Sequence, residues 1–256
     1  MKSPCRFGLR TLVSVSFCVA TMVVTCTWLG LSHGIAMAQD EEPQFTLEFD
    51  LEGCEGFEAK GANRYFILNP GYQLVLEGEE EGDAVRLVIT VLHQTEKIVL
   101  PDIGMVKTRV VEEQHSVNGK LVEVSRNFFA ICDETNDVYY FGEEVDIFLS
   151  DGTISHDGSW RAGVAGAMPG IIMPGTFLLG SRYFQERAPG VAMDRAEHVE
   201  MGLEVETEAG TFEKCVRVVE TTPLEPGAES EKIYCPGVGL VGDNAVELVE
   251  FGFDNH

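Results

Sequence analysis

Hydrophobic and polar residues alternate along most of this chain. Between residues 83 and 94, every second position is apolar, namely Val85, Leu87, Ile89 and Val91. Leu203 and Val205 alternate with glutamates in the same way. Alternation with a period of two places one set of side chains on each face of a strand, and helical periodicity is nearly absent after residue 38. The pattern predicts an all-β protein, an antiparallel meander that forms a sandwich or an open barrel.

Turn residues divide this pattern into strands. Asn118-Gly119 favours a two-residue type I′ hairpin between residues 105–115 and 120–132, and Asp151-Gly152 can close a second hairpin. Six of the ten prolines are followed by glycine, a pair typical of turns. We therefore expect short connections and one continuous domain.

The most aromatic pair of strands is expected to be the centre of the core. If residues 133–137 form a turn, Ile131 lies opposite Tyr139 and Phe129 lies opposite Phe141. Cross-strand aromatic pairs of this kind stabilise sheets.

The first 38 residues are typical of a secretory signal peptide. Lys2, Arg6 and Arg10 precede an apolar run over residues 11–31, and Ala36-Met37-Ala38 is a small-x-small cleavage site. An uncleaved membrane anchor is the alternative, since the run is about as long as a membrane span. We expect residues 1–38 to be removed and residues 39–256 to form a single β-rich domain, exported to the periplasm or the extracellular medium, with no membrane span after cleavage.

Four cysteines remain after residue 38: Cys54, Cys132, Cys215 and Cys235. In an exported chain they predict up to two disulfides. A hairpin register that opposes Val219 to Glu231 also opposes Cys215 to Cys235, which makes that pair the first choice. The pair Cys54–Cys132 follows by elimination.

The net charge of −24 is strongly acidic. Such a surface repels nucleic acid and anionic membranes, so neither is an expected partner. The charge is compatible with a cation-binding or purely structural role, and it also keeps an exported protein soluble.

The segment DGSWRAGVAGAMPGIIMPG, residues 157–175, is exceptional because positions 162–175 carry no charge. An exposed apolar stretch of this length would form a patch that proteins usually bury or use. Two interpretations stay open: a Gly/Pro-rich plug or loop under the sheet, or the lining of a groove for an apolar or peptide ligand. The candidate ligand-binding residues are Trp160, Met168, Ile171, Ile172 and Met173.

A second set of candidates is polar. His156, Asp157, Glu186, Asp194 and His198 could serve a hydrolase or a metal-dependent enzyme if at least three of them converge, since catalytic groups are assembled in space. The alternative is a surface loop with ordinary ion pairs, which contribute little.

Motifs for metals and cofactors are absent or incomplete. There is no C-x-x-C pair of the kind used by structural zinc sites. The loop 133–137 begins like a calcium loop, but Val138 stands where such a loop needs glycine. We expect no cofactor and no metal.

Several blocks of sequence resemble a family of uncharacterised exported bacterial proteins. They include VYYFGE at 138–143, GSWRAG at 158–163, GAMPGIIMP at 166–174, YFQE at 183–186, TPLEPG at 222–227 and YCPGVG at 234–239. The chain departs from the family pattern at Asn136, where glycine is expected, and at Tyr139, where tryptophan is expected. The resemblance implies a β-rich exported protein and carries no activity or catalytic residue.

Together these features favour a non-enzymatic exported protein that binds a ligand or an envelope partner. A hydrolase or metal-dependent enzyme, and an acidic structural or cation-binding protein, are the alternatives.

Overall fold

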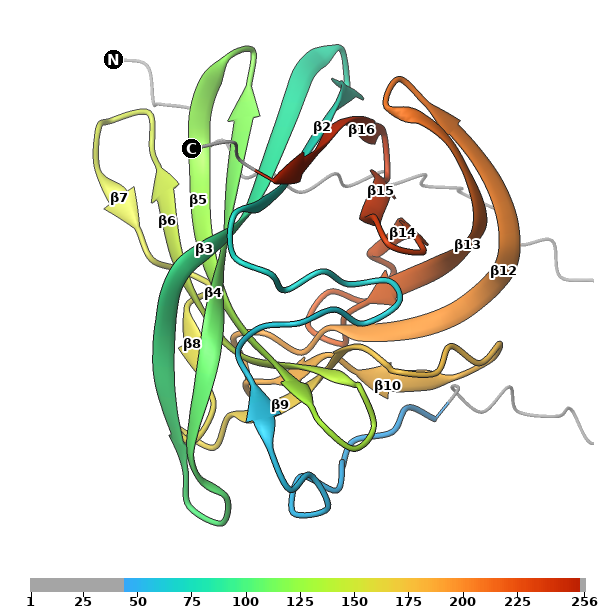
Figure 1. The fold of residues 1–256 in the computed structure, drawn as a ribbon. Helices are drawn as coiled ribbons and strands as arrows, with labels where there is room; N and C mark the ends of the chain where they lie inside the picture. Colours follow the sequence, from blue (N-terminus) through green and yellow to red (C-terminus); the bar gives the residue numbers. More distant parts are fainter. Residues whose placement is uncertain (1–43, 254–256) are drawn as a thin grey trace, which may run out of the picture. The chain divides into compact units, whose positions relative to one another are not determined.

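The computed structural model describes residues 44–253, which form β-strands and no helix (Figure 1). The strands are β1 (Phe57–Glu58), β2 (Tyr72–Glu80), β3 (Asp83–Leu100), β4 (Gly104–Val117), β5 (Lys120–Cys132), β6 (Val138–Phe148), β7 (Ile154–Ser155), β8 (Trp160–Arg161), β9 (Met168–Met173), β10 (Arg182–Phe184), β11 (Glu186–Arg187), β12 (Arg195–Thr207), β13 (Gly210–Thr221), β14 (Glu229–Cys235), β15 (Gly239–Asp243) and β16 (Val246–Phe253). The all-β prediction is confirmed. The predicted signal peptide lies outside the described residues.

All of these strands belong to one antiparallel sheet. Its main path runs β10-β12-β13-β14-β15-β16-β2-β3-β4-β5-β6-β9-β11. The two end strands, β10 and β11, are separated along the chain by Gln185 alone. The sheet therefore curls around an interior, with β3–β6 facing β12–β14 in Figure 1, but hydrogen bonds do not close it.

No helix within residues 44–253 has the length and apolarity needed to cross a membrane.

The predicted hairpin turns are present. Asn118 and Gly119 have φ of 50° and 74°, as a type I′ turn requires, and they connect β4 to β5. Gly152, with φ of 85°, lies in the turn between β6 and β7. Local sequence was sufficient here because positive φ restricts the residue type.

The predicted pairing between β5 and β6 was wrong by one residue. Phe129 lies opposite Tyr140, not Phe141, and Tyr139 lies opposite Ala130, not Ile131. The rings of Phe129 and Tyr140 still pack, with centroids 4.8 Å apart.

The turn that joins these strands explains the shift. The backbone N–H of Cys132 donates to the Asp137 carbonyl at 2.9 Å, so the turn holds four residues, 133–136, and not five. Asn136 takes the left-handed conformation, with φ of 61°. A turn of four residues changes which side chains are opposite each other.

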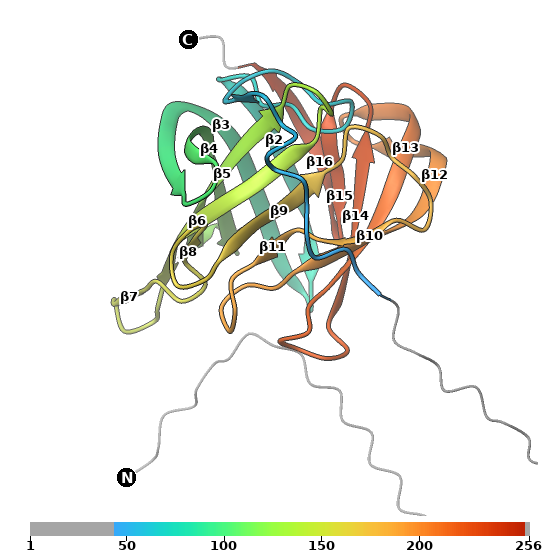
Figure 2. The same cartoon turned by 90° about the horizontal axis from the view of Figure 1, so that it is seen from below.

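The apolar segment that we expected as a plug or loop is built partly into the sheet. Residues 168–173 form β9, which pairs with β6 on one side and β11 on the other (Figure 2). Gly170 leaves no room for a side chain, since an added Cβ would overlap the backbone of Phe184 and Gln185. Met173 is fully buried. Within this segment, residues 169–171 and 173 lack charge because they are buried in the sheet, whereas residues 163–166 precede the strand and are exposed.

A different segment, residues 59–71, covers one end of the interior; we call it the cap. The Nδ2 of Asn63 donates to the carbonyls of Asn136 at 2.8 Å and Pro174 at 2.9 Å. On the opposite wall, the N–H of Gly237 donates to the Arg64 carbonyl at 2.9 Å. The cap thus bridges the two walls, as Figure 1 shows.

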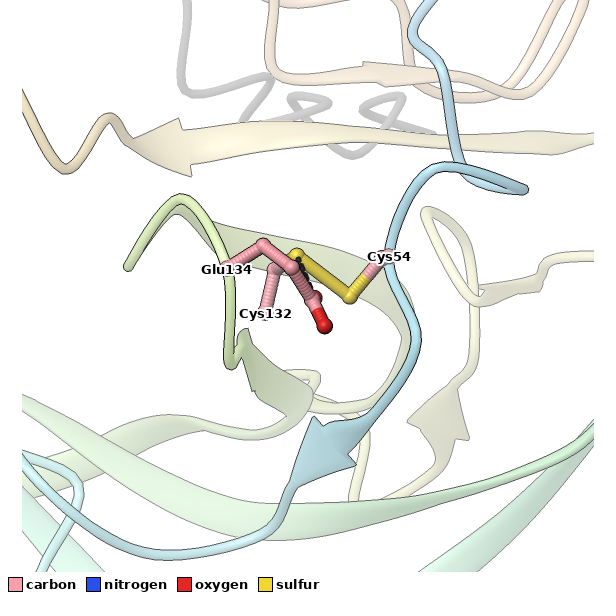
Figure 3. A group of neighbouring side chains, drawn as sticks. All are labelled: Cys54, Cys132 and Glu134. Atoms are coloured by element: carbon pink, nitrogen blue, oxygen red, sulfur yellow. Dashed lines mark hydrogen bonds between the residues drawn. A yellow bond between two sulfur atoms is a disulfide. The ribbon is translucent and has the colours of Figure 1, made fainter.

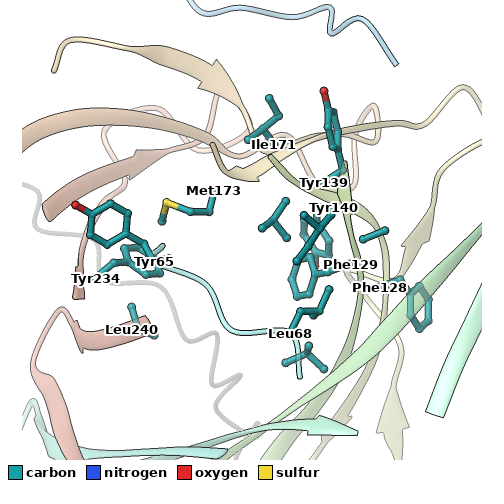
Figure 4. Packing of buried hydrophobic residues seen from close by; sticks show 14 of the residues in the cluster. Tyr65, Leu68, Phe128, Phe129, Tyr139, Tyr140, Ile171, Met173, Tyr234 and Leu240 are labelled. Atoms are coloured by element: carbon teal, nitrogen blue, oxygen red, sulfur yellow. The ribbon is translucent and has the colours of Figure 1, made fainter. Parts of the chain in front are cut away.

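The core lies between the cap and both walls. Leu68 of the cap is fully buried, and Figure 4 shows it near Phe129 and Tyr140. Met173 and Tyr234, on the two walls, belong to the same buried cluster. Packing of these side chains joins the cap to both walls.

Both predicted disulfides are present. The Cys54–Cys132 bond ties the chain before the cap to the end of β5, and Cys215–Cys235 joins β13 to β14. The predicted register of that hairpin is also confirmed, because Val219 lies opposite Glu231. Two disulfides fit an oxidising environment.

Candidate functional site: an interior cavity

The curled sheet surrounds a partly open cavity of about 230 Å³ below the cap. Its lining comes from the cap and from nearly every long strand: Phe66, Ile67, Tyr72, Leu74, Ile89, Val91, Val111, Glu113, Asn127, Phe129, Tyr140, Glu143, Ile172, Gln185, Glu186, Asp194, Glu220, Lys232, Tyr234, Val238, Gly239 and Leu240. A concave apolar site with a few convergent polar groups is the usual form of a small-molecule site.

One side of the cavity is apolar. It is formed by Leu74 of β2, by Ile89 and Val91 of β3, and by Val111 of β4. These are the inward positions of the alternating pattern read from the sequence.

A β-bulge brings an acidic side chain into the opposite side. In β6, Glu143 lies opposite Asn127 and Tyr140 lies opposite Phe129, so three steps in β6 match two in β5. The extra residue lets both Tyr140 and Glu143 face the interior. Gly142, within the bulge, has φ of 154°, and a Cβ there would overlap the Trp160 carbonyl.

A second bulge acts in the same way on the other wall. Tyr234 of β14 lies opposite Leu240 of β15, whereas Lys232 lies opposite Asp243. Leu240 therefore lines the main cavity, and the carboxylate of Asp243 reaches Lys232. Each bulge inserts one extra residue, and the strand beyond it therefore turns the opposite set of side chains inward.

Lys232 is the single amine in the cavity lining, and it pairs with two carboxylates of the protein. Its Nζ lies 3.4 Å from Glu220 Oε2 and 3.4 Å from Asp243 Oδ2. Burial by itself lowers the pKa of Lys232, but the two carboxylates outweigh burial and hold this pKa well above its usual range. Gln185 fixes Glu220 by donating from Nε2 at 2.7 Å. Lys232 is therefore a charged group that is already held in two ion pairs.

Three other carboxyl groups lie in the cavity without a cationic partner in contact. Burial raises the pKa of Glu143 to about 7, and the nearby charge of Glu113 acts in the same direction. Burial also raises the pKa of Glu113, and it raises that of Glu186 well above its usual range. Glu186 accepts a hydrogen bond from the backbone N–H of Asp194 at 2.6 Å. Perturbed carboxyl groups in a cavity are typical of functional sites.

Glu113 also lines a second cavity of about 210 Å³. This cavity lies next to hairpin turns, with Glu80 beside the β2–β3 turn and Asn244 in the β15–β16 turn. The shared residue makes the two cavities neighbours along the interior. The end of the interior away from the cap is therefore polar.

The structure places the predicted ligand-binding residues mostly in the sheet core. Trp160 is 7% exposed and packs edge-on against Tyr140 at 5.1 Å between centroids. Ile171 and Met173 are buried, whereas Met168 is exposed. Among these five residues, Ile172 alone lines the main cavity.

The predicted polar cluster does not assemble. Glu186 and Asp194 meet in the cavity lining. His198 lies outside it, buried against Phe177, and its Nε2 is 2.8 Å from the Tyr183 hydroxyl. Burial lowers the pKa of His198 to about 4, so this residue is a neutral core group at neutral pH.

His156 and Asp157 lie elsewhere on the surface. The Nδ1 of His156 is 3.0 Å from Asp146 Oδ1, and the His156 side chain is 69% exposed. With only two of the five candidates together, the three convergent groups that the hydrolase hypothesis requires are not assembled.

One group of side chains in residues 44–253 is close enough to share a metal ion: Cys54, Cys132 and Glu134 (Figure 3). Its two sulfurs are joined in a disulfide. Metal-binding sulfur is thiolate, so this group does not form a metal site while the bond is intact.

The cavity residues Glu113, Glu143, Glu220 and Lys232 were not identified from the sequence. A signal was present, since Glu220 follows Val216 and Val218 on the apolar face of its strand, and Glu113 follows Val111. A charge on the apolar face of an alternating strand indicates a functional interior.

No protein-family model, curated protein or solved structure matches the chain.

Proposed function

We propose that this protein is an exported, non-enzymatic binding protein that holds one small ligand in the cavity below the cap. The observation that carries the proposal is the cavity itself, which lies within a curled sheet held by two disulfides and is lined on one side by apolar groups and on the other by carboxyl groups. Such a lining favours a ligand with an apolar and a polar part.

Export rests on the sequence of residues 1–38 and is supported by the two disulfides. The interior is the better candidate site than the segment around Trp160, because that segment is largely buried within the sheet.

The test is calorimetric titration of the exported protein, purified after expression of the full coding chain, with n-hexylamine, 1-hexanol and hexanoate. We expect at least one of these six-carbon probes to bind with one-to-one stoichiometry. Binding should also raise the melting temperature by mass action.

Two matched variants locate the site. Ile89→Trp places a large ring in the cavity and should abolish binding, whereas Val88→Trp lies on the other face of β3 and should preserve it. Absence of binding by all three probes, or equal binding by both variants, would overturn the proposal.

A further inference from the structure

The charge balance of the cavity is uneven. Besides Asp194, its lining holds four carboxyl groups, Glu113, Glu143, Glu186 and Glu220, against one amine, Lys232. That amine is already shared between Glu220 and Asp243. The interior therefore lacks a positive charge that an entering molecule could provide.

Glu113 is the group best placed to receive such a charge. Its carboxyl makes no hydrogen bond or ion pair with another described residue, although it lines both cavities and interacts electrostatically with Glu143 and with Lys232. A carboxylate in a cavity with no cation in contact is stabilised when a cation binds it.

Tyr234 gives a second, independent indication of a ligand. The residue is 5% exposed and lines the cavity, and its hydroxyl forms no hydrogen bond within residues 44–253. This hydroxyl, which has no partner in the described part of the protein, opens on the cavity, where a hydrogen-bonding group of a bound molecule can reach it. A ligand with a polar head in this position would supply that partner.

Aromatic rings add to the preference for a cation. The lining includes Phe66, Tyr72, Phe129, Tyr140 and Tyr234. The faces of such rings attract ammonium groups, and cages of aromatic side chains are a recurrent means of binding them.

We infer that the ligand of the proposed binding function is a small amphiphilic amine, with its ammonium group near Glu113, Glu143 and Tyr234 and its apolar part against β2 and β3. This inference rests on the proposed function. The cavity has about eight times the volume that one water molecule occupies in the liquid, so the amine is smaller than a drug-sized molecule.

Other ligand classes fit less well. Among residues 44–253, no three of the cavity carboxylates lie close enough to share a metal ion. An anion would meet the unpaired carboxyl groups and would have to displace the carboxylates that hold Lys232.

The three six-carbon probes separate this inference from the proposed function. At about pH 8, n-hexylamine should bind about tenfold more tightly than 1-hexanol, because a charged group gains more from each buried hydrogen bond, and hexanoate should bind least. If 1-hexanol or hexanoate binds as well as the amine, the inference fails while the binding function stands. If none of the probes binds, both fail.

A pair of neighbouring substitutions tests the site of the ammonium group. Glu113→Gln should weaken n-hexylamine binding about tenfold and leave 1-hexanol binding unchanged. The control is Glu112→Gln, on the other face of β4, where the glutamate pairs with Arg126 at 3.2 Å. Equal effects of the two variants on the amine would overturn the assignment to Glu113.

Acidification is a further readout of the same site. The charged or titratable groups that interact with Glu113 are Lys232, Asp243, Glu123, Glu220, Glu143, Tyr140 and Tyr234. Because protonated carboxyl groups attract an ammonium group weakly, n-hexylamine affinity should fall several-fold between about pH 8 and about pH 5. Affinity for the amine that rises on acidification would contradict the inference.

Discussion

At the scale of single residues, the interior carboxyl groups are the unusual feature of this protein. Their burial is unfavourable when they are charged, so the fold places them in the cavity at a cost to its stability. Glu143 is the clearest case, since burial raises its pKa to about 7 from the ordinary value of 4.5. Functional sites commonly carry groups of this kind, whose environment opposes their charge.

The first prediction concerns Glu143→Gln. A carboxyl group with a raised pKa destabilises the folded state only where it must ionise, so its effect is absent below about pH 4.5 and grows as pH rises through about 7. At about pH 8 the free energy of unfolding of the variant should exceed that of the original chain by about 3 kcal/mol, because each pKa unit corresponds to about 1.4 kcal/mol. Urea unfolding at both pH values measures this difference.

The control is Glu144→Gln, at a neighbouring, more exposed position where the carboxylate lies 3.1 Å from Arg161. This change should give no gain at about pH 8. A gain from Glu143→Gln that is the same at low and high pH would show that Glu143 does not titrate as described.

At the scale of elements, two bulges decide which side chains enter the cavity. Tyr140 and Glu143 are three residues apart, so in a regular strand they would face opposite sides of the sheet. The bulge depends on Gly142. Its positive φ favours glycine, and a side chain at this position would overlap the Trp160 carbonyl. Strand irregularity is thus part of how this sheet forms a site.

The second prediction is therefore that Gly142→Ala affects both stability and binding. Strain and the overlap with Trp160 should lower the free energy of unfolding by about 2 kcal/mol, and n-hexylamine binding should weaken as Glu143 moves. Urea unfolding and calorimetry measure the two effects.

Gly119→Ala provides the matched control. Gly119 also has positive φ, 74°, but nothing lies near its missing Cβ at the tip of the β4–β5 hairpin. We expect a loss of about 1 kcal/mol with unchanged binding. If both variants bind n-hexylamine like the original chain, the bulge does not position the site.

At the scale of the whole described region, residues distant in sequence hold the interior closed. Strand β16 pairs with β2, and the cap connects β13–β15 to the strands of the opposite wall. The Cys54–Cys132 disulfide spans 78 residues, whereas Cys215–Cys235 spans 20. A longer closed loop restricts the unfolded chain more.

The third prediction compares the removal of each disulfide. Replacing Cys54 and Cys132 by alanine should lower the free energy of unfolding by about 4 kcal/mol, and replacing Cys215 and Cys235 by about 3 kcal/mol. Denaturant unfolding of the two double variants gives both values. The opposite order would show that the Cys54–Cys132 bond contributes little to holding the cap segment.

Much of the local structure follows from the sequence alone. The alternation of Val85 to Val91, the type I′ turn at Asn118-Gly119 and the pairing of Cys215 with Cys235 depend on neighbours in the chain or on residue types with few allowed conformations. These features were predicted correctly because the forces that decide them are local.

The site required the tertiary structure. Glu113, Glu143, Glu220 and Lys232 come from four different strands, and two bulges set the side on which several cavity residues point. The identity of the cap likewise depends on contacts between residues more than 70 positions apart, such as Asn63 with Asn136. The sequence by itself determined the long alternating strands, the Asn118-Gly119 turn and the Cys215–Cys235 pair, whereas only the folded sheet decided the register of β5 with β6 and which charges share one interior. Both depend on pairing between strands and not on the period of any single strand.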